Sequence, residues 1–380
     1  ELPPKALKKL SLAFLGGVKT GLEKVDLPFN SIKSFASPRR LALLITELAA
    51  HTADKAIERR GPALQAAYGE DGCPTKAAIG FARSCGVEVE DLDKLENDKG
   101  SWLIYKSQQQ GQAASALIPD MVTAALDALP IPKRMRWGTL DTQFVRPVHW
   151  AVLLFGNDII EAEILSVRTG RTTYGHRFHH PGPIEIPAPS EYEVLLESEG
   201  KVIADFDRRA STVRAQVESK AMDLKGQAVI DEALLEEVTA MVEWPVAVAG
   251  QFEERFLVVP QEALISTMSA NQKYFHLVDQ HHKLLPYFIT VSNIESRDET
   301  RVQAGNERVI RPRFADAEFF WNQDRKRPLD SHLGELKSVV FQQKLGSLFD
   351  KTQRVAKLAA SIAKQLKAES ALAIRAAELS

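Results

Sequence analysis

The feature that most constrains the fold is a helix-period stretch at residues 305–324. Its apolar residues Ile310, Phe314, Ala317 and Trp321 recur at intervals of four, three and four, so they share one face of an α-helix. Charged residues occupy the other positions. The stretch therefore predicts a helix that is half core and half charged surface.

The same stretch allows two interpretations of its arginines. Pro312 is expected to open the helix, because a missing N–H is tolerated in the first turn, and Arg311 is then extended before it. Arg311 and Arg313 would flank a helix N-terminus, where Arg forks beside free N–H groups suit phosphate. Alternatively, the arginines pair with Asp316 and Glu318 in a structural ion network.

The charge balance excludes a global attraction to nucleic acid or membrane. The chain has 380 residues, with 48 basic against 50 acidic side chains, so such binding requires local patches. The length favours two or three domains. Cys73 and Cys85 alone cannot form a four-thiolate zinc site or a disulfide framework, and a reducing cytoplasmic compartment fits best. We find no signal peptide or membrane span. Both ends suggest a fragment, because the chain starts without Met and ends in an Ala-rich, helix-favouring run.

Paired arginines mark two expected chain breaks. Arg39 and Arg40 follow Pro38 between two expected strands, and Arg59 and Arg60 precede a Gly-Pro dipeptide. Loops that carry paired arginines are candidate phosphate contacts. Solvated turn charges are the alternative for each pair.

The densest cationic and aromatic segment follows an expected first-domain boundary near residue 130. Lys133, Arg134 and Arg136 are interleaved with Met135 and Trp137, and Arg146 lies a little further on in Phe-Val-Arg-Pro-Val-His. Cations for phosphates and a flat ring for stacking are what single-stranded or looped RNA requires. The alternative places the Trp and Met in the core.

Three histidines within five residues raise the question of a metal. The segment Gly-His176-Arg177-Phe-His179-His180-Pro is extended before its proline and follows no H-E-x-x-H pattern. We therefore expect no metal site. His176 and Arg177 are candidate donors to a ligand or a phosphate, and structural histidines are the alternative.

The elements expected elsewhere are helices and short strands. Helices are predicted from Pro4 to near Gly21 and at residues 76–85, 113–129, 191–221 (one or more, with a solvated charged face), 234–238, 260–271 and throughout the stretch from 329. Strands are predicted at residues 32–35, 41–45, 102–106, 148–155, 159–167, 242–248, 277–279 and 287–291. The fold class is α+β, with a mixed α/β N-terminal region and a helical C-terminal segment.

No catalytic residue can be assigned. The sequence contains no G-x-x-x-x-G-K-[ST], no G-x-G-x-x-G and no G-x-S-x-G. No pair of carboxylates can be given acid and base roles from spacing alone. A long chain with several basic aromatic patches and no active-site signature favours a binding partner over a self-sufficient enzyme.

Ordered motifs along almost the whole chain resemble the beta subunit of the bacterial two-subunit glycyl-tRNA synthetase. They lie at residues 1–6, 38–42, 59–62, 130–138, 144–149, 175–178, 243–245, 271–275, 305–308 and 315–320. The resemblance implies an α2β2 ligase whose alpha subunit holds ATP, magnesium and glycine, so that no cofactor is bound by this chain. It implies that the beta subunit grips glycine-specific tRNA in the cytoplasm, without a membrane.

The resemblance also implies a division of the chain. Residues 1–130 would form an N-terminal α+β domain, and residues 131–328 a tRNA-binding region similar to the editing module of the phenylalanyl-tRNA synthetase beta subunit. Residues 329–380 would lead into an HD-type helical domain. The family's anticodon-binding domain and the strand before Glu1 are missing from this sequence.

Three roles remain open for this chain. The first is tRNA binding, with candidate contacts Arg39, Arg40, Arg59, Arg60, Lys133, Arg134, Arg136, Trp137, Arg146, His176, Arg177, Arg311 and Arg313. The second is hydrolysis of mischarged tRNA, with residues 176–180 lining the pocket. The third is a structural platform for the alpha subunit. Within the tRNA-binding role, the stretch at residues 305–324 is better explained as a junction helix that its arginines brace.

Overall fold

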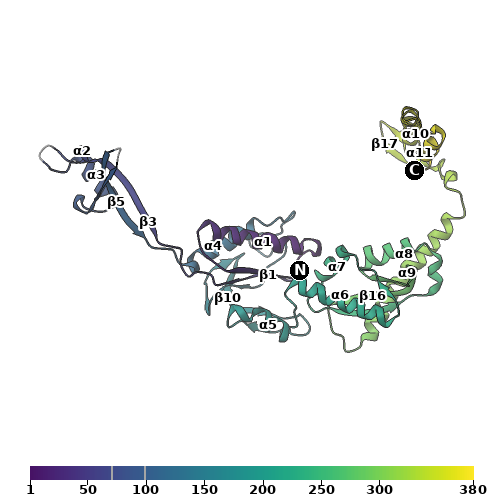
Figure 1. Ribbon diagram of the computed structural model, residues 1–380. Helices are drawn as coiled ribbons and strands as arrows, with labels where there is room; N and C mark the ends of the chain where they lie inside the picture. The colour runs from purple at the N-terminus through teal and green to yellow at the C-terminus, as the bar shows by residue number, and fades with distance from the viewer. Residues whose placement is uncertain (70–71, 98–99) are drawn as a thin grey trace. The chain divides into compact units, whose positions relative to one another are not determined.

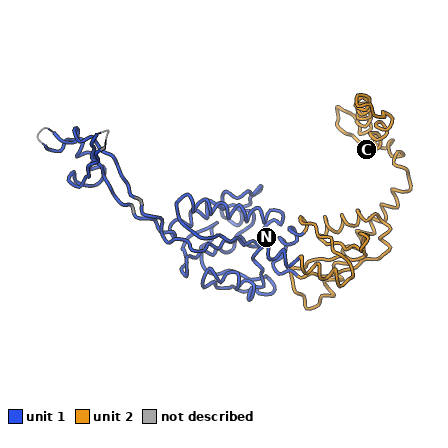
Figure 2. Tube along the Cα trace, viewed as in Figure 1, with its two compact units in different colours: residues 1–213, 235–245 blue, residues 214–234, 246–380 orange. Residues whose placement is uncertain are grey.

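The structure, a computed structural model, describes residues 1–69, 72–97 and 100–380 and combines helices with mainly antiparallel sheets (Figure 1). These residues form two compact units (Figure 2). Unit 1 contains residues 1–213 and 235–245, and unit 2 contains residues 214–234 and 246–380. The α+β fold class is confirmed.

The body of unit 1 is organised around helix α1 (Pro4–Lys24), which packs against α4 (Ala114–Asp127) and the hairpin of β1 (Ser31–Ser37) and β2 (Arg40–Thr46). Apolar side chains at intervals of three or four along α1 are buried, including Leu7, Leu10 and Phe14. Gly17 lets the two helices approach, because a Cβ there would lie 2.9 Å from the Cβ of Ala125. Helix α1 extends beyond the stop expected near Gly21.

Further elements of unit 1 are short. They are β6 (Ala151–Val152), β7 (Leu154–Phe155), β8 (Asp158–Ile159), β9 (Glu163–Ile164), β10 (Val167–Gly170), β11 (Thr172–Tyr174), β12 (Pro183–Glu185), the 3-10 helix η2 (Pro189–Glu191), α5 (Tyr192–Ser198) and the start of α6 (Phe206–Asp223). The long strands predicted at residues 148–155 and 159–167 are therefore wrong. Each range is broken into short pieces: Leu153 separates β6 from β7, and left-handed backbone at Leu165 and Ser166 separates β9 from β10.

Residues 55–109 form a separate small module within unit 1. Its sheet has the order β3-β5-β4, from β3 (Lys55–Ala63), β4 (Asp93–Asn97) and β5 (Gly100–Gln109). Helices α2 (Leu64–Ala67) and α3 (Lys76–Cys85) and the turn η1 (Val89–Asp91) complete the module. The prediction for residues 76–85 is confirmed: Thr75 caps α3, and Gly86 ends it with φ 72°.

The chain break predicted at residues 58–62 is wrong, because these residues lie inside β3. Gly61 and Pro62 coincide with an irregularity of register between Arg60 and Ala63. A strand tolerates proline at such a bulge, where no ladder donor is needed. A Cβ on Gly61 would meet the ring of Phe81 at 2.5 Å, so the glycine also allows close packing.

The core of unit 1 crosses the boundary expected near residue 130. Leu126 and Leu129 share one hydrophobic cluster with Phe144, Val145 and Ile164. The structure thus groups the residues differently from the three ranges that the resemblance implies.

Unit 2 is built on a sheet of order β13-β15-β16-β14. Its strands are β13 (Gln227–Ala228), β14 (Val246–Gln251), β15 (Phe275–Val278) and β16 (Leu284–Ser292). The other elements up to residue 324 are the end of α6, the start of α7 (Glu232–Thr239), η3 (Glu254–Val258), α8 (Gln261–Ser266), the π-helical turn η4 (Thr267–Gln272) and α9 (Glu299–Asp324). The strands predicted at residues 277–279 and 287–291 fall within or next to β15 and β16, which pair antiparallel on either side of His281 and His282.

Helix α9 contains the whole helix-period stretch at residues 305–324. Ile310 and Phe314 are fully buried, and Ala317 and Trp321 pack against the same cluster, so the predicted core face is confirmed. The predicted start at Pro312 is wrong, because the helix begins at Glu299 and the proline lies inside it. Arg311 is helical for the same reason, and no helix N-terminus is available beside Arg311 and Arg313.

The C-terminal segment of unit 2 is not helical throughout. It contains the 3-10 helices η5 (Leu329–His332) and η6 (Glu335–Ser338), the hairpin of β17 (Val340–Gln342) and β18 (Gly346–Ser347), and helices α10 (Leu348–Gln365) and α11 (Ser370–Leu379). The helical prediction is confirmed from Leu348, holds within residues 329–338 only as two short 3-10 helices, and is wrong for the hairpin at residues 340–347. The turn of this hairpin lies at residues 343–345 and leads into Gly346, whose φ is 85°.

Candidate functional site

A buried ion cluster lies at the turn between β1 and β2. Arg39 donates through Nε and Nη2 to Oε2 of Glu243, at 3.1 and 2.7 Å. Nη1 of Arg40 donates to the other carboxylate oxygen at 2.5 Å, and Oγ of Ser37 donates to it at 2.9 Å. The carboxylate therefore accepts hydrogen bonds on both oxygens, which a buried charge requires.

The cluster fixes the charge of Glu243. Burial alone would raise the pKa of this carboxyl, but the attraction of Arg40 and the hydrogen bonds from Arg39 and Ser37 outweigh burial, and the pKa lies below its ordinary value. The ion pairs are thus fully formed at neutral pH.

The two arginines also bind a third segment. Nη2 of Arg39 donates to the carbonyl oxygen of Gly175 at 2.5 Å, and Nη2 of Arg40 donates to that of Tyr174 at 2.6 Å. Sequence motifs that are more than 60 residues apart, at residues 38–42, 175–178 and 243–245, therefore meet at one place in the fold. Arg40 is only 5% exposed, so its position does not fit the predicted phosphate contact.

Arg209 is a further buried guanidinium that the sequence analysis assigned to a solvated helix face. It is 0% exposed and donates to the carbonyl oxygens of Thr239, Ile203 and Ala36 at 3.0, 2.5 and 2.7 Å. Burial lowers its pKa to about 10, which leaves it charged at neutral pH. The missed signal is the four-residue spacing from Arg209 to Val213, which places the arginine on the apolar face.

The histidine segment has a structural use. His176 is 1% exposed, and its Nδ1 accepts the backbone N–H groups of Phe178 and His179, each at 3.2 Å. Arg177 points elsewhere, with 63% of its side chain exposed, and lies 3.8 Å from the carboxylate of Glu1. The structure thus separates two neighbours that the sequence analysis grouped.

The cations of the densest segment are mostly on the surface. Lys133 and Arg136 are exposed, and Arg136 lies 3.3 Å from Asp141. Arg134 donates to the carbonyl oxygen of Asp127 at 2.7 Å. Trp137 packs against the hydrophobic core of unit 1, which is the alternative that the sequence analysis kept open.

The remaining candidates lie in β3 and α9. Arg59 is exposed and donates to the carbonyl oxygen of Ser84 at 3.3 Å, and the guanidinium of Arg60 lies 3.5 Å from the ring centroid of Trp102. Arg311 pairs with Glu253 at 2.7 Å, not with Asp316 or Glu318 as the alternative expected. Arg313 donates to the carbonyl oxygen of Val309.

Unit 1 also contains a surface pocket of about 480 Å³ next to the ion cluster. Residues from the first four positions of the chain line it together with Pro38, Arg146, Arg177, Ala240 and Met241. Arg146 and Arg177, two of the predicted tRNA contacts, therefore line the same pocket.

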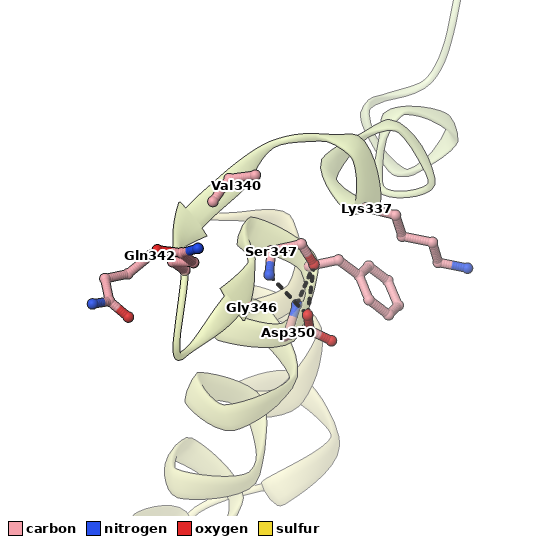
Figure 3. A pocket seen from close by; sticks show the side chains of 8 residues that line it. Lys337, Val340, Gln342, Gly346, Ser347 and Asp350 are labelled. Carbon is pink, nitrogen blue, oxygen red and sulfur yellow. Dashed lines mark hydrogen bonds between the residues drawn. The ribbon is translucent and has the colours of Figure 1, made fainter.

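A second pocket, of about 590 Å³, lies in the C-terminal segment of unit 2. Figure 3 shows Ser347 and Asp350 turned toward each other at its edge. They form a capping box at the start of α10, in which Asp350 Oδ2 accepts from the backbone N–H and the hydroxyl of Ser347, both at 2.8 Å. These polar groups therefore serve the helix start.

Within residues 1–69, 72–97 and 100–380, no three His, Cys, Asp or Glu side chains are grouped as a metal site would require. In the same ranges, no helix combines the length and the apolar character needed to cross a membrane.

Comparison with known proteins identifies the family. The profile described as glycyl-tRNA synthetase beta subunit matches residues 1–380. The chain belongs to the glycyl-tRNA synthetase beta subunit family. The glycine–tRNA ligase beta subunits of Hahella chejuensis and Marinobacter nauticus are 55% and 53% identical over 380 residues, which is 100% of this chain and 55% of each relative. That of Azotobacter vinelandii is 52% identical with the same coverage.

The chain thus spans about half the length of the curated relatives that it matches. Membership of the family confirms the resemblance seen in the sequence. The structure adds that three of the resembling motifs, at residues 38–42, 175–178 and 243–245, build one buried ion cluster.

Proposed function

We propose that this chain is a tRNA-binding, non-catalytic part of a glycine–tRNA ligase beta subunit. In this proposal it supports the attachment of glycine to its tRNA by an alpha subunit in the cytoplasm. ATP and magnesium belong to the alpha subunit, consistent with the lack of a glycine-rich phosphate loop in this sequence.

The observation that carries the proposal is the exposure of cations on unit 1. Lys133, Arg136, Arg146 and Arg177 are all exposed, although the chain as a whole has a slight negative charge. Binding to a polyanion by such a chain must use a local patch. The relatives' names refer to a ligase that acts on tRNA, which is the polyanion we propose.

The test compares the complete α2β2 assembly with a Lys133→Ala, Arg136→Ala variant. Each cation that contacts a phosphate releases roughly one counterion, so the variant should bind glycine-specific tRNA more weakly. Its plot of log K against log salt should be flatter by about 1 to 2 units of slope. An Arg83→Ala variant, which removes an exposed cation from α3, is the matched control. Identical affinity and slope for all three proteins would refute the role of this patch.

A specific observation also favours the platform role for residues 329–380. Large apolar side chains are unusually exposed there, including Val340 at 73%, Leu358 at 63% and Leu366 at 74%. Exposed apolar side chains that lie together are typical of a contact surface, and in this role the alpha subunit covers them. Leu358→Glu with Ile362→Glu should reduce recovery of the intact assembly by size-exclusion chromatography, and unchanged recovery would count against this role.

The editing role receives less support. The most buried imidazole of its expected pocket, His176, accepts two backbone N–H groups and holds a loop. Incubation of the complete assembly with mischarged glycine-specific tRNA tests the role directly, because a hydrolase must release the amino acid faster than the buffer does.

A further inference from the structure

The pocket of unit 1 combines cations with apolar walls. Arg146 and Arg177 supply its positive charges, and Glu1 supplies a carboxylate. Leu2, Pro38 and Met241 provide apolar surface. Its volume of about 480 Å³ falls in the range of small-ligand sites, roughly 300 to 1,000 Å³. The lining therefore suits a ligand with one anionic group and one apolar or aromatic part.

The pocket walls are held by the protein. The backbone N–H of Leu2 donates to the carbonyl oxygen of Pro38 at 2.6 Å, which fixes the first residues on the β1–β2 turn. Pro38 directly precedes Arg39, and Met241 lies two residues before Glu243. The buried ion cluster thus anchors two walls, and a preorganised pocket binds with a smaller loss of entropy.

The buried charges beside the pocket are unbalanced. Arg39 and Arg40 both pair with the carboxylate of Glu243, and the buried guanidinium of Arg209 is attracted by the same carboxylate. Asp205 also acts on Arg209, but it is shared with Lys33, whose Nζ lies 3.0 Å from it. Salt screens buried charges much less than exposed ones, so the excess contributes a positive potential at the adjacent surface.

The arginines at the rim are available to a ligand. Arg146 is exposed and donates through Nη1 to the carbonyl oxygen of its neighbour Val145. The 3.8 Å separation of Arg177 from Glu1 is long for a hydrogen bond, and both side chains are more than 60% exposed. An exposed pair of this kind contributes little and is easily exchanged for a stronger anion. A phosphate is such an anion, because its oxygens match the guanidinium fork.

We propose that this pocket binds a backbone phosphate of a tRNA nucleotide, with the sugar or base of the same nucleotide against Leu2, Pro38 and Met241. The proposal rests on the tRNA-binding function proposed above and names a site for it. Arg146 and Arg177 contact the phosphate, and the buried guanidinium cluster supplies the long-range attraction.

The test uses the full-length beta subunit assembled with the alpha subunit. Arg146→Ala and Arg177→Ala should each weaken tRNA binding roughly tenfold, and together they should lower the salt slope by about 2. Met241→Glu, which adds a carboxylate at a 40% exposed position, should weaken binding as well. Arg168→Ala, an exposed cation on β10, is the matched control and should bind as the unmodified protein does. Melting temperatures confirm that each variant is folded.

The outcomes separate this site from the broader function. If Lys133→Ala with Arg136→Ala weakens tRNA binding but the pocket variants do not, the function stands and the pocket proposal fails. If neither set has an effect, both proposals fail. Titration with inorganic phosphate shows whether the pocket binds a free phosphate ion and not a phosphate of tRNA. If the pocket variants lose phosphate binding but keep their affinity for tRNA, the proposal is overturned.

Discussion

Arg40 and Glu243 form an ion pair across 203 positions of the sequence, with 2.5 Å between Nη1 and Oε1 and with both side chains 3% exposed. Removing one partner of a buried pair leaves the other charge uncompensated. Arg39 joins the same carboxylate, so Glu243 neutralises two guanidinium groups at once.

Glu243→Ala should destabilise the chain by about 3 to 5 kcal/mol, because it leaves Arg39 and Arg40 without their shared counter-charge. Urea unfolding followed by circular dichroism measures the loss. The control is Glu232→Ala, which breaks the exposed pair with Arg214 and should cost less than about 1 kcal/mol. Equal effects of the two substitutions would contradict the structural role of the cluster.

Acid should weaken the cluster in a defined direction. The pKa of Glu243 in the folded protein lies below its ordinary value of 4.5, so the unfolded chain takes up a proton first as the pH falls. The stabilisation from this group is complete above about pH 4.5 and is lost as the pH falls through the folded pKa. Melting curves between pH 7 and pH 3 should therefore fall more steeply for the unmodified chain than for Glu243→Gln. Parallel curves would show that another group controls acid unfolding.

Helix α9 should depend on its apolar face far more than on its arginines. Phe314 is fully buried and packs edge-on against Phe252 and Phe256, with ring centroids 4.8 and 5.7 Å away. Phe314→Ala should cost about 3 to 5 kcal/mol. Arg311→Ala breaks a pair whose side chains are 57% and 40% exposed, and it should cost less than about 1 kcal/mol.

The same Arg311→Ala variant tests whether α9 contacts tRNA. Because Arg311 forms an ion pair with Glu253, we expect Arg311→Ala to leave the tRNA affinity unchanged and to lower the melting temperature slightly. A weaker affinity at an unchanged melting temperature would reverse this conclusion and assign the arginine to tRNA.

Gly250→Ala should destabilise the sheet of unit 2. A Cβ at this position would lie 2.3 Å from the ring of Phe288, its partner on β16. That ring cannot give way easily, because it is fully buried and stacks on Tyr274 with 4.5 Å between centroids. The overpacking should cost about 1 to 3 kcal/mol by urea unfolding. Gly305→Ala, where the added methyl meets nothing within 4 Å, should leave stability unchanged or raise it slightly.

Local patterns predicted the elements whose signals are local. Helix α3 has its cap at Thr75 and its stop at Gly86 within the same few residues. Strands β1 and β2 directly flank the turn that joins them. The apolar residues of α9 recur on one face over three helical turns. Pro312 was misassigned because proline is rare inside helices, and the apolar contacts of its neighbours keep it there.

The site could be predicted only as a set of motifs. The sequence shows that Arg39 and Arg40 are adjacent, but not that their partner is Glu243 or that Gly175 accepts from one of them. These partners lie more than 130 positions away, and no periodic pattern connects them. The burial of Arg209 can be predicted from the sequence, because Arg209, Val213 and Val217 recur at intervals of four and share the buried face of α6.

The ion cluster has a consequence for dividing this protein into pieces. The turn at residues 37–40 needs the carbonyl groups at 174 and 175 and the carboxylate at 243. If the chain is cut between these segments and the products separate, the buried guanidinium groups of Arg39 and Arg40 lose the carboxylate of Glu243. Limited proteolysis and shortened expression clones should therefore yield no stable product that contains the turn at residues 37–40 and ends between residues 46 and 242, except where the complementary piece stays bound. The shortest autonomous N-terminal piece must extend through Pro245.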